Sequence, residues 1–245
     1  SETFYRYDNR ERLFMIIEKT EIDDVYLVKN LLPKCQHSKI YDIICYKSKW
    51  NFSPDSQDDQ RAIEDTRVEP YFAKVIFAFN PVRGCYEQSS EEEWYAIVHP
   101  LVLSVSTQEW FRPILRIKAN LYPKTEKRIN HSIHTDFLVN QTSSLPWNSD
   151  LAMTNMVYMV NSNDGYTEIF EKDPRVKTPA SDLYNDSFHD EHNLPLWSDV
   201  NEDNIRTIKI PSVENTAVIF PNKYAHRATT ATNAQARFTI NCNLL

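Results

Sequence analysis

The strongest constraint on the fold is a series of short apolar or alternating segments in the second half of the chain, separated by turn residues. Eight segments are expected to form strands: 115–122, 132–139, 152–161, 166–170, 206–210, 216–220, 225–230 and 236–243. Short strands at such intervals indicate a β-sandwich or barrel, and eight is the strand number of a jelly roll. We therefore expect a mainly β (α+β) protein with a jelly-roll core.

The first and last of these segments alternate strictly between polar and apolar side chains. The polar members are Arg116, Lys118, Asn120 and Tyr122 in the first, and Arg237, Thr239, Asn241 and Asn243 in the last. Successive side chains of a strand point to opposite faces. A polar row that faces the interior of a jelly roll costs free energy unless it lines a site. The alternation alone does not decide which row faces inward.

Residues 1–110 mix helical and strand patterns and differ from the jelly-roll core expected at 111–245. The expected elements are helices at 23–32 and after the capping box Ser90-Glu91-Glu92-Glu93, and strands at 43–52 and 74–79. Helices beside the first strands would cover one face of a sheet. We expect residues 1–245 to form a single domain.

One connection is much longer than a turn requires. Residues 171–205 are rich in Asp, Asn and Pro and separate two expected strands. Loops of this length without secondary structure are usually functional lids or disordered inserts. We expect a partly ordered insert that covers a site, whose carboxylates favour neutral or cationic substrates at the entrance.

The composition excludes several classes of protein. Only two glycines are present, so neither a dinucleotide-binding fingerprint nor a P-loop can form. The net charge of −7 makes nucleic acid an unlikely partner, because phosphate binding needs a positive footprint. The four cysteines form no CxxC pair, as expected in a reducing compartment. No apolar run approaches the roughly 18 residues of a membrane span, so we expect a cytoplasmic protein that does not interact with membranes.

Four residues form a candidate metal site with an adjacent cation. His134 and Asp136 are two apart on an expected strand and therefore point to one face. His226 lies on a later strand, and Arg237 follows on the last. Two imidazoles and a carboxylate on one side of a metal leave the opposite positions open, as in non-haem Fe(II) oxygenases. His131 competes with His134 but lies three residues away, on the opposite face, so we expect it to be a bystander.

The segments around these residues resemble the 2-oxoglutarate- and Fe(II)-dependent dioxygenases, which have a double-stranded β-helix (jelly-roll) fold. The resemblance covers about residues 110–245. Within the family, this part of the chain is most similar to the prolyl-hydroxylase-like and bacteriophage-type branch. It is carried by residues 116–123, by the turn at 161–167, and by 225–227 followed by 237–241. The insert at 171–205 departs from shorter relatives and leaves the substrate class open.

The resemblance implies a role for each candidate residue. His134, Asp136 and His226 would ligate Fe(II), while Arg237 would bind the distal carboxylate of the cosubstrate 2-oxoglutarate. An arginine presents a rigid fork that suits a carboxylate. The catalytic domain would use O2 to hydroxylate a small-molecule or peptide substrate and release succinate and CO2.

Further cosubstrate contacts are also implied. Tyr122 and Thr239 match residues that contact 2-oxoglutarate in the family, and a second tyrosine is expected within 157–159. Whether Tyr158 or Met159 faces the cosubstrate depends on the register of this strand. The alternative interpretation is a jelly-roll protein without catalysis, either a small-ligand-binding module or a structural (viral) protein. The oligomeric state stays open.

Overall fold

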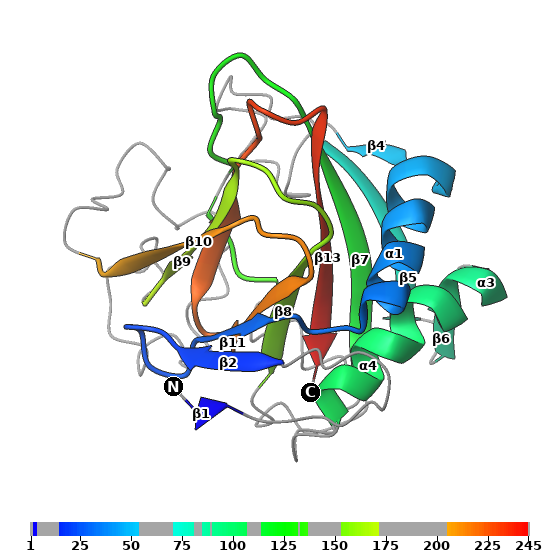
Figure 1. The fold of residues 1–245 in the computed structure, drawn as a ribbon, viewed down its shortest axis with the longest axis horizontal. Helices are drawn as coiled ribbons and strands as arrows, with labels where there is room; N and C mark the ends of the chain where they lie inside the picture. The colour runs from blue at the N-terminus through cyan, green and yellow to red at the C-terminus, as the bar shows by residue number, and fades with distance from the viewer. Residues whose placement is uncertain are drawn as a thin grey trace, which may run out of the picture.

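The computed structural model describes residues 2–3, 15–53, 71–80, 85–88, 90–106, 114–131, 133–136, 153–171 and 205–244. Within these ranges two antiparallel sheets lie against each other, and the helices cover the outer face of the larger sheet (Figure 1). No helix in these ranges is long and apolar enough to cross a membrane.

The larger sheet has ten strands and contains the centre of the fold. Its order is β1-β2-β3-β11-β8-β13-β7-β5-β4, with β6 paired to β5. The strands are β1 (Glu2–Thr3), β2 (Ile16–Lys19), β3 (Tyr26–Lys29), β4 (Asn51–Ser53), β5 (Tyr71–Asn80), β6 (Cys85–Gln88), β7 (Ile114–Pro123), β8 (Thr154–Met159), β11 (Thr216–Pro221) and β13 (Ala236–Leu244). The N-terminal strands therefore extend the same sheet that the C-terminal half forms.

The smaller sheet has the order β10-β9-β12, with β9 (Tyr166–Phe170), β10 (Thr207–Pro211) and β12 (Ala225–Ala228). Two isolated antiparallel bridges, Asn130↔Thr229 and His134↔His226, place the segment before residue 137 beside β12. Along the chain, β7, β8, β11 and β13 lie in the larger sheet, whereas β9, β10 and β12, which come between them in sequence, form the smaller one. This alternation is the topology of a jelly roll and confirms the predicted fold class.

Seven of the eight predicted core strands are present, with ends shifted by at most two residues. The predicted strand at 132–139 is not regular in its described part, where His134 makes a single bridge to His226. Two residues later, the Asp136 side chain accepts hydrogen bonds from Arg116 and Asn243 of the larger sheet. Residues 137–139 lie outside the described ranges.

The predicted helix at 23–32 is wrong, because Tyr26–Lys29 forms β3 and pairs with β11. Leu27 and Val28 pack into different hydrophobic clusters on opposite faces of the strand. A strand buried on both faces loses its period-2 pattern, and its apolar residues can then imitate helical spacing. The chain turns before and after the strand at Asp24 (φ 60) and Asn30 (φ 52), which both have a left-handed backbone conformation.

The first helix follows Pro33 instead. It is α1 (Lys34–Asp42) and is continued by a π-helical turn at Ile43–Lys47. Most of the strand predicted at 43–52 is therefore also wrong, and the strand that forms there, β4, is limited to Asn51–Ser53. The strand predicted at 74–79 lies within β5. The helix predicted after Ser90 is confirmed as α3 (Glu91–Glu93), a π-helical turn (Trp94–Val98) and α4 (His99–Ser106). The Glu93 amide donates to Ser90 Oγ over 3.3 Å, as half of a capping box does.

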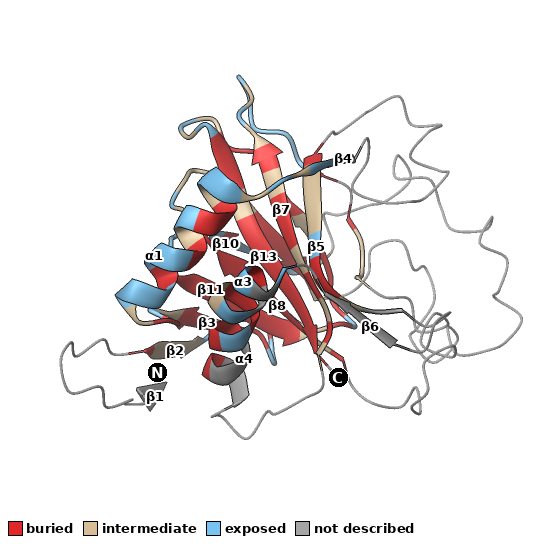
Figure 2. Cartoon of the chain, turned by 90° about the vertical axis from the view of Figure 1, so that its right-hand side faces the viewer, coloured by how far each residue is buried: buried red, intermediate tan, exposed pale blue. Residues whose placement is uncertain are grey.

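The main hydrophobic core lies between the helices and the larger sheet. Ile40 and Ile44 from the first helical segment and Leu101 from α4 pack on one face of β7 and β13, where they meet Ile117 and Ile240. Figure 2 shows the helices lying over this face, with exposed residues on their outer side. The apolar row of each alternating strand therefore faces the helices, and the polar row faces the smaller sheet.

The predicted insert begins and ends at neighbouring points of the smaller sheet. The amide of Glu171 donates to the carbonyl of Arg206 over 3.0 Å, beside the antiparallel pair β9–β10. The insert therefore extends a hairpin connection and leaves the register of the sheet unchanged. Residues 172–204, on which the prediction of a lid rests, lie outside the described ranges.

Asn215 offers a test of how the jelly roll is joined to the first helix. It has φ 56, its side chain accepts from the Leu32 amide over 3.0 Å, and its Nδ2 donates to the Leu32 carbonyl over 2.8 Å. We expect Asn215→Ala to lower the free energy of unfolding by about 3 kcal/mol, from lost buried hydrogen bonds and left-handed strain.

Asn215→Gly should cost about 1 kcal/mol less than the alanine variant, because glycine adopts positive φ without strain. Urea denaturation of the two variants, with the exposed neighbour variant Glu214→Ala as control, measures the difference. Equal stabilities of the glycine and alanine variants would show that the backbone conformation contributes nothing.

Candidate active site

A cavity between the two sheets is lined by five of the six predicted site residues, all except Asp136. The larger sheet contributes the polar rows of β7 and β13, and the smaller sheet contributes β12, part of β9 and the segment that contains His134. The lining residues are Tyr71, Lys118, Asn120, Tyr122, His134, Val157, Thr167, His226, Ala228, Arg237, Thr239 and Asn241. The polar row that the sequence could not orient therefore lines this cavity.

His134, Asp136 and His226 form a cluster suited to a metal ion. Each offers one ligand atom, and these atoms all lie within 4.8 Å of one another. His134 Nε2 is 3.9 Å from Asp136 Oδ1, and His226 Nε2 is 4.0 Å from Asp136 Oδ2. Ligand atoms at about 2.1 Å from one ion can be separated by roughly 3 to 4 Å, so these donors fit a single ion. Two imidazoles and one carboxylate are the donor set of a mononuclear Fe(II) site.

The two histidines are positioned by the backbone. Their amides and carbonyls exchange hydrogen bonds of 2.9 and 2.8 Å across the isolated bridge. Directly opposed residues of an antiparallel pair point to the same face, and the imidazole centroids lie 4.4 Å apart. Phe220 packs against the His226 ring at 5.1 Å between centroids. The pairing of 134 with 226 therefore brings two ligands together that are distant in sequence.

Asp136 is held by two residues of the larger sheet. Arg116 Nη2 donates to Oδ1 over 3.0 Å, and Asn243 Nδ2 donates to Oδ2 over 2.7 Å. Asn243 also donates to Asn155 Oδ1 over 2.9 Å, which fixes the orientation of its amide. Burial raises the pKa of Asp136, but Arg116 and the two nearby histidines outweigh it and hold the pKa well below its usual range. The carboxylate is therefore charged and oriented toward the imidazoles.

Arg237 is a fully buried cation. Its Nε donates to Ser212 Oγ and its Nη2 to Thr167 Oγ1, both over 2.7 Å, while Nη1 reaches the Thr229 carbonyl at 3.4 Å. Among the described residues no carboxylate forms an ion pair with it. Burial lowers its pKa to about 10, so the guanidinium stays charged at neutral pH. A buried charge without a counter-ion costs several kcal/mol, and an anionic ligand would offset that cost.

One of the two glycines lies against this arginine. A Cβ atom added at Gly165 would lie 2.8 Å from Arg237 Cδ and 2.8 Å from Asn163 Oδ1, closer than real contacts allow. The turn before β9 therefore needs glycine so that the arginine can extend past it. A larger residue there would displace the guanidinium.

Tyr122 and Thr239 lie beside Arg237. The guanidinium carbon is 5.4 Å from the centroid of the Tyr122 ring, and the Thr239 hydroxyl forms a hydrogen bond with the phenol. Burial raises the pKa of Tyr122 far above its ordinary value, although Arg237 opposes the shift. The phenol is therefore protonated and can donate to an anion bound at Arg237.

His131 lies outside the cluster of candidate ligands. It is buried, and its ring packs edge-on against Tyr122 with the centroids 4.7 Å apart. Burial and then the positive charge of Arg237 lower the pKa of His131 to about 3. It is therefore a neutral packing partner of Tyr122.

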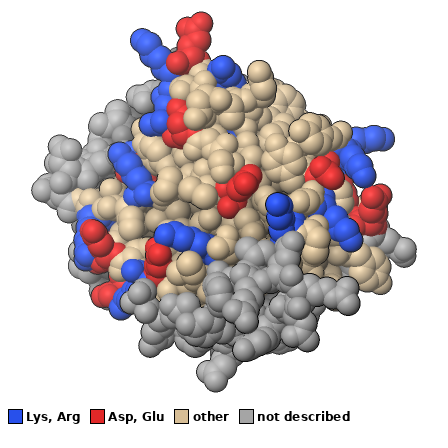
Figure 3. Space-filling model, viewed as in Figure 1, with Lys and Arg blue, Asp and Glu red and all other residues tan. Residues whose placement is uncertain are grey.

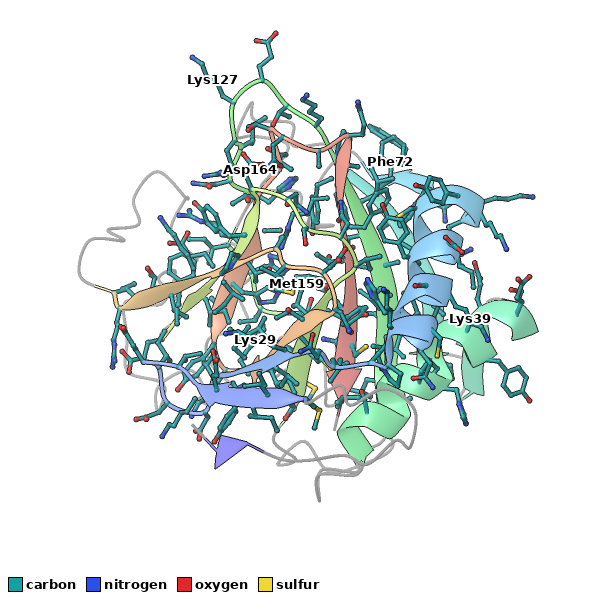
Figure 4. The ribbon with its side chains drawn as sticks, viewed as in Figure 1. Lys29, Lys39, Phe72, Lys127, Met159 and Asp164 are labelled. Carbon is teal, nitrogen blue, oxygen red and sulfur yellow. The ribbon has the colours of Figure 1, made fainter. Side chains whose placement is uncertain are left out.

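The strand register places Met159, and not Tyr158, on the cavity side of β8. Tyr158 lies under α1, where its hydroxyl is 2.6 Å from His37 Nδ1 and donates to Asn215 Oδ1 over 3.2 Å. Met159 lies opposite Thr239 and belongs with Val157 to the cluster on the inner face. Figure 4 labels Met159 near the middle of the fold.

Of the cavity residues that the sequence did not assign, four lie on β5, β7 and β13. Tyr71 of β5 stacks on Tyr122 with ring centroids 5.7 Å apart and planes at 17°. Lys118 donates to the Tyr71 hydroxyl over 3.2 Å, and Asn120 and Asn241 lie next to it on β7 and β13. The alternation of the two strands already marked three of the four as members of one polar row. Nothing local in the sequence pointed to Tyr71.

Comparison with known proteins gives similarity of fold without similarity of sequence. No protein-family model matches the chain, and no curated protein matches its sequence. Solved structures do match, at low identity. An oxidoreductase of the 2OG-Fe(II) oxygenase family from Burkholderia pseudomallei has a TM-score of 0.54 and 9% identity, and the match covers 90% of this chain and 85% of that one.

Two further structures belong to nogalamycin biosynthesis. The epimerase SnoN, in complex with Fe3+, alpha ketoglutarate and a nogalamycin compound, has a TM-score of 0.56 at 9% identity, over 91% of this chain and 79% of that one. The carbocyclase SnoK has a TM-score of 0.52 at 13% identity, over 90% and 78%. The chain therefore has the double-stranded β-helix fold of the 2-oxoglutarate- and Fe(II)-dependent oxygenases.

Proposed function

We propose that this protein is an Fe(II)- and 2-oxoglutarate-dependent oxygenase that hydroxylates an organic substrate with O2 and releases succinate and CO2. The observation that carries the proposal is Arg237, which is fully buried, has no carboxylate partner among the described residues, and lines the same cavity as His134 and His226. A cation and a set of metal ligands in one cavity suit a ligand that is both a chelator and an anion.

The metal and the cosubstrate would be bound by different groups of residues. His134, Asp136 and His226 would hold Fe(II), and their three donors leave positions for a 2-oxo acid and for oxygen. Bound iron would supply the redox chemistry with O2. Arg116 and Asn243 keep Asp136 ionised and oriented, so the metal would meet ligands that need little rearrangement.

Arg237, Tyr122 and Thr239 would bind the distal carboxylate of 2-oxoglutarate. The hydrogen bonds of Arg237 to Ser212, Thr229 and Thr167 engage one N–H on each nitrogen, and a guanidinium has five N–H groups. An N–H on each terminal nitrogen is therefore left for a bidentate contact. The protonated Tyr122 phenol adds a donor, and the buried surroundings strengthen both interactions.

A jelly-roll protein without catalysis is the alternative, and no observation in the described part of the chain favours it. A structural protein would have to bear the cost of burying Arg237 without an anion. A ligand-binding module without redox chemistry could hold a metal ion with the clustered imidazoles and carboxylate, but it would not need a carboxylate-binding Arg237. The proposed oxygenase gives a role to both groups.

The metal assignment is tested by replacing its ligands. His134→Ala, Asp136→Ala and His226→Ala should each abolish measurable Fe(II) binding and succinate formation, because three ligands leave no redundancy. Asn243→Ala, which removes only a partner of Asp136, should weaken Fe(II) binding about 10- to 100-fold. Anaerobic Fe(II) titration measures both effects.

The exposed His99 provides the matched control, since His99→Ala removes an imidazole far from the cluster in sequence and should bind Fe(II) as the unchanged protein does. Retention of full Fe(II) affinity in any of the three ligand variants would contradict the assignment.

The cosubstrate assignment is tested with Arg237→Lys, which keeps the charge and loses the planar fork. Affinity for 2-oxoglutarate should fall about tenfold or more, and each tenfold corresponds to about 1.4 kcal/mol. The measurement is the visible absorption band expected when anaerobic Fe(II) protein binds 2-oxoglutarate, followed during titration. Fe(II) affinity should stay unchanged. Unaltered 2-oxoglutarate affinity in this variant would remove the main support for the oxygenase.

A further inference from the structure

An ion pair on the outer face of the smaller sheet lies one residue away from His226. Glu168 of β9 and Arg227 of β12 are directly opposite each other in the strand register. Nε and Nη2 of Arg227 both donate to Glu168 Oε2, each over 2.8 Å. Since successive side chains of a strand alternate between its faces, this pair lies on the side away from the cavity that His226 lines. Neither residue belongs to the proposed iron site or to the proposed cosubstrate site.

The ion pair is shielded from solvent. The side chains of Glu168 and Arg227 are 5% and 13% exposed. On the face that Figure 3 shows, by contrast, basic and acidic side chains are interspersed on the surface, where water and salt screen their interactions. The guanidinium carbon of Arg227 also lies 5.3 Å from the centroid of the buried Phe170 ring. These contacts fix β12 relative to β9 at this point.

β12 has few other side chains that could determine its register. Its four residues are Ala225, His226, Arg227 and Ala228, and the two alanines offer only methyl groups for packing. In the described part of the chain β9 is its partner strand, and its other edge is joined through isolated bridges. Register is specified by the pattern of packed side chains, which two alanines supply only weakly. The pairing of Arg227 with Glu168 therefore determines where β12 lies along β9.

A change of this register would displace His226. A shift of one residue would turn its imidazole to the outer face, and a shift of two would move it by roughly 7 Å along the sheet. Either change would separate the imidazole from the Asp136 carboxylate, which is 4.0 Å away. β9 itself would stay in place, because its five residues pair with β10 on the other side. Thr167 of β9, which accepts from Arg237, would therefore keep its position.

We propose that Glu168 and Arg227 are positioning residues, whose ion pair holds β12 in the register that brings His226 to the other metal ligands. This inference rests on the proposed function, in which His226 binds Fe(II). Lys209 of β10 is also opposite Glu168, and its Nζ lies 3.8 Å from Oε1. Removal of Arg227 therefore leaves the carboxylate beside a second cation, and β12 should loosen without an isolated buried charge.

The test replaces each member of the pair and measures Fe(II) binding by anaerobic titration. Arg227→Met removes the charge and keeps an unbranched side chain, while Glu168→Gln keeps the shape and removes the charge. Each should weaken Fe(II) binding about tenfold or more, as replacements of groups that orient a metal ligand do. Arg227→Lys should recover most of the lost affinity, because both contacts of Arg227 are to a single oxygen, which an ammonium can also bind.

The affinity for 2-oxoglutarate is the second measurement. It is taken from the visible absorption band at saturating Fe(II). It should stay nearly unchanged in Arg227→Met and in Glu168→Gln, because Arg237 and Thr167 keep their places. A role confined to His226 thus predicts a loss in metal affinity that is not matched by a loss in cosubstrate affinity.

A second buried ion pair provides the matched control. Lys74 of β5 binds Glu93 of α3, their side chains are 16% and 11% exposed, and neither lines the cavity. Lys74→Met should lower the thermal unfolding midpoint and leave Fe(II) affinity unchanged. Hydrogen exchange at 225–228, measured before Fe(II) is added, should be faster in Arg227→Met than in Lys74→Met, because the loosening is local to β12.

The outcomes separate this inference from the proposed function. If Arg227→Met and Glu168→Gln bind Fe(II) as tightly as the unchanged protein, the pair is only structural and the inference is wrong, while the oxygenase stands. If Lys74→Met weakens Fe(II) binding as much as they do, the effect follows global stability and the inference is again wrong. Should Arg227→Met fail to fold, the comparison of Glu168→Gln with Lys74→Met decides.

Hydrogen exchange decides the case in which the proposed function itself fails. If the unchanged protein binds no Fe(II), the oxygenase is wrong. Faster exchange at 225–228 in Arg227→Met than in Lys74→Met would then still show that the ion pair holds β12. Equal exchange in the two variants would overturn that as well.

Discussion

The antiparallel pairing of β7 with β13 is the constraint on which the site depends. Its register sets Tyr122 opposite Arg237, Asn120 opposite Thr239, Lys118 opposite Asn241, and Arg116 opposite Asn243. All eight polar side chains then face the smaller sheet, and the apolar residues between them face the helices. A slip of one residue would exchange the two faces. It would bury Arg237 in the apolar core and expose Ile117 and Ile240 to the cavity, so register and site are specified together.

Buried charges at the two ends of this strand pair are compensated differently. At one end Arg116 and Asp136 neutralise each other, which keeps a metal ligand ionised without a large penalty. At the other end the hydrogen-bond partners of Arg237 among the described residues are hydroxyl and carbonyl oxygens, which hold its fork in place and leave its charge uncompensated. A neutral scaffold of this kind fixes geometry without competing with an anionic ligand. The protein thus loses some stability at the end where a ligand is to be bound.

Local patterns predicted the parts of this structure that depend on local chemistry. Period-2 alternation located β7 and β13, and the spacing of His134 and Asp136 identified two members of the metal cluster. The pattern failed for β3, because a strand buried on both faces does not alternate. It could not choose between Tyr158 and Met159 either, since that choice follows from pairing with β11 and β13. Tyr71 reaches the cavity only because β5 pairs with β7, a contact between residues distant in sequence.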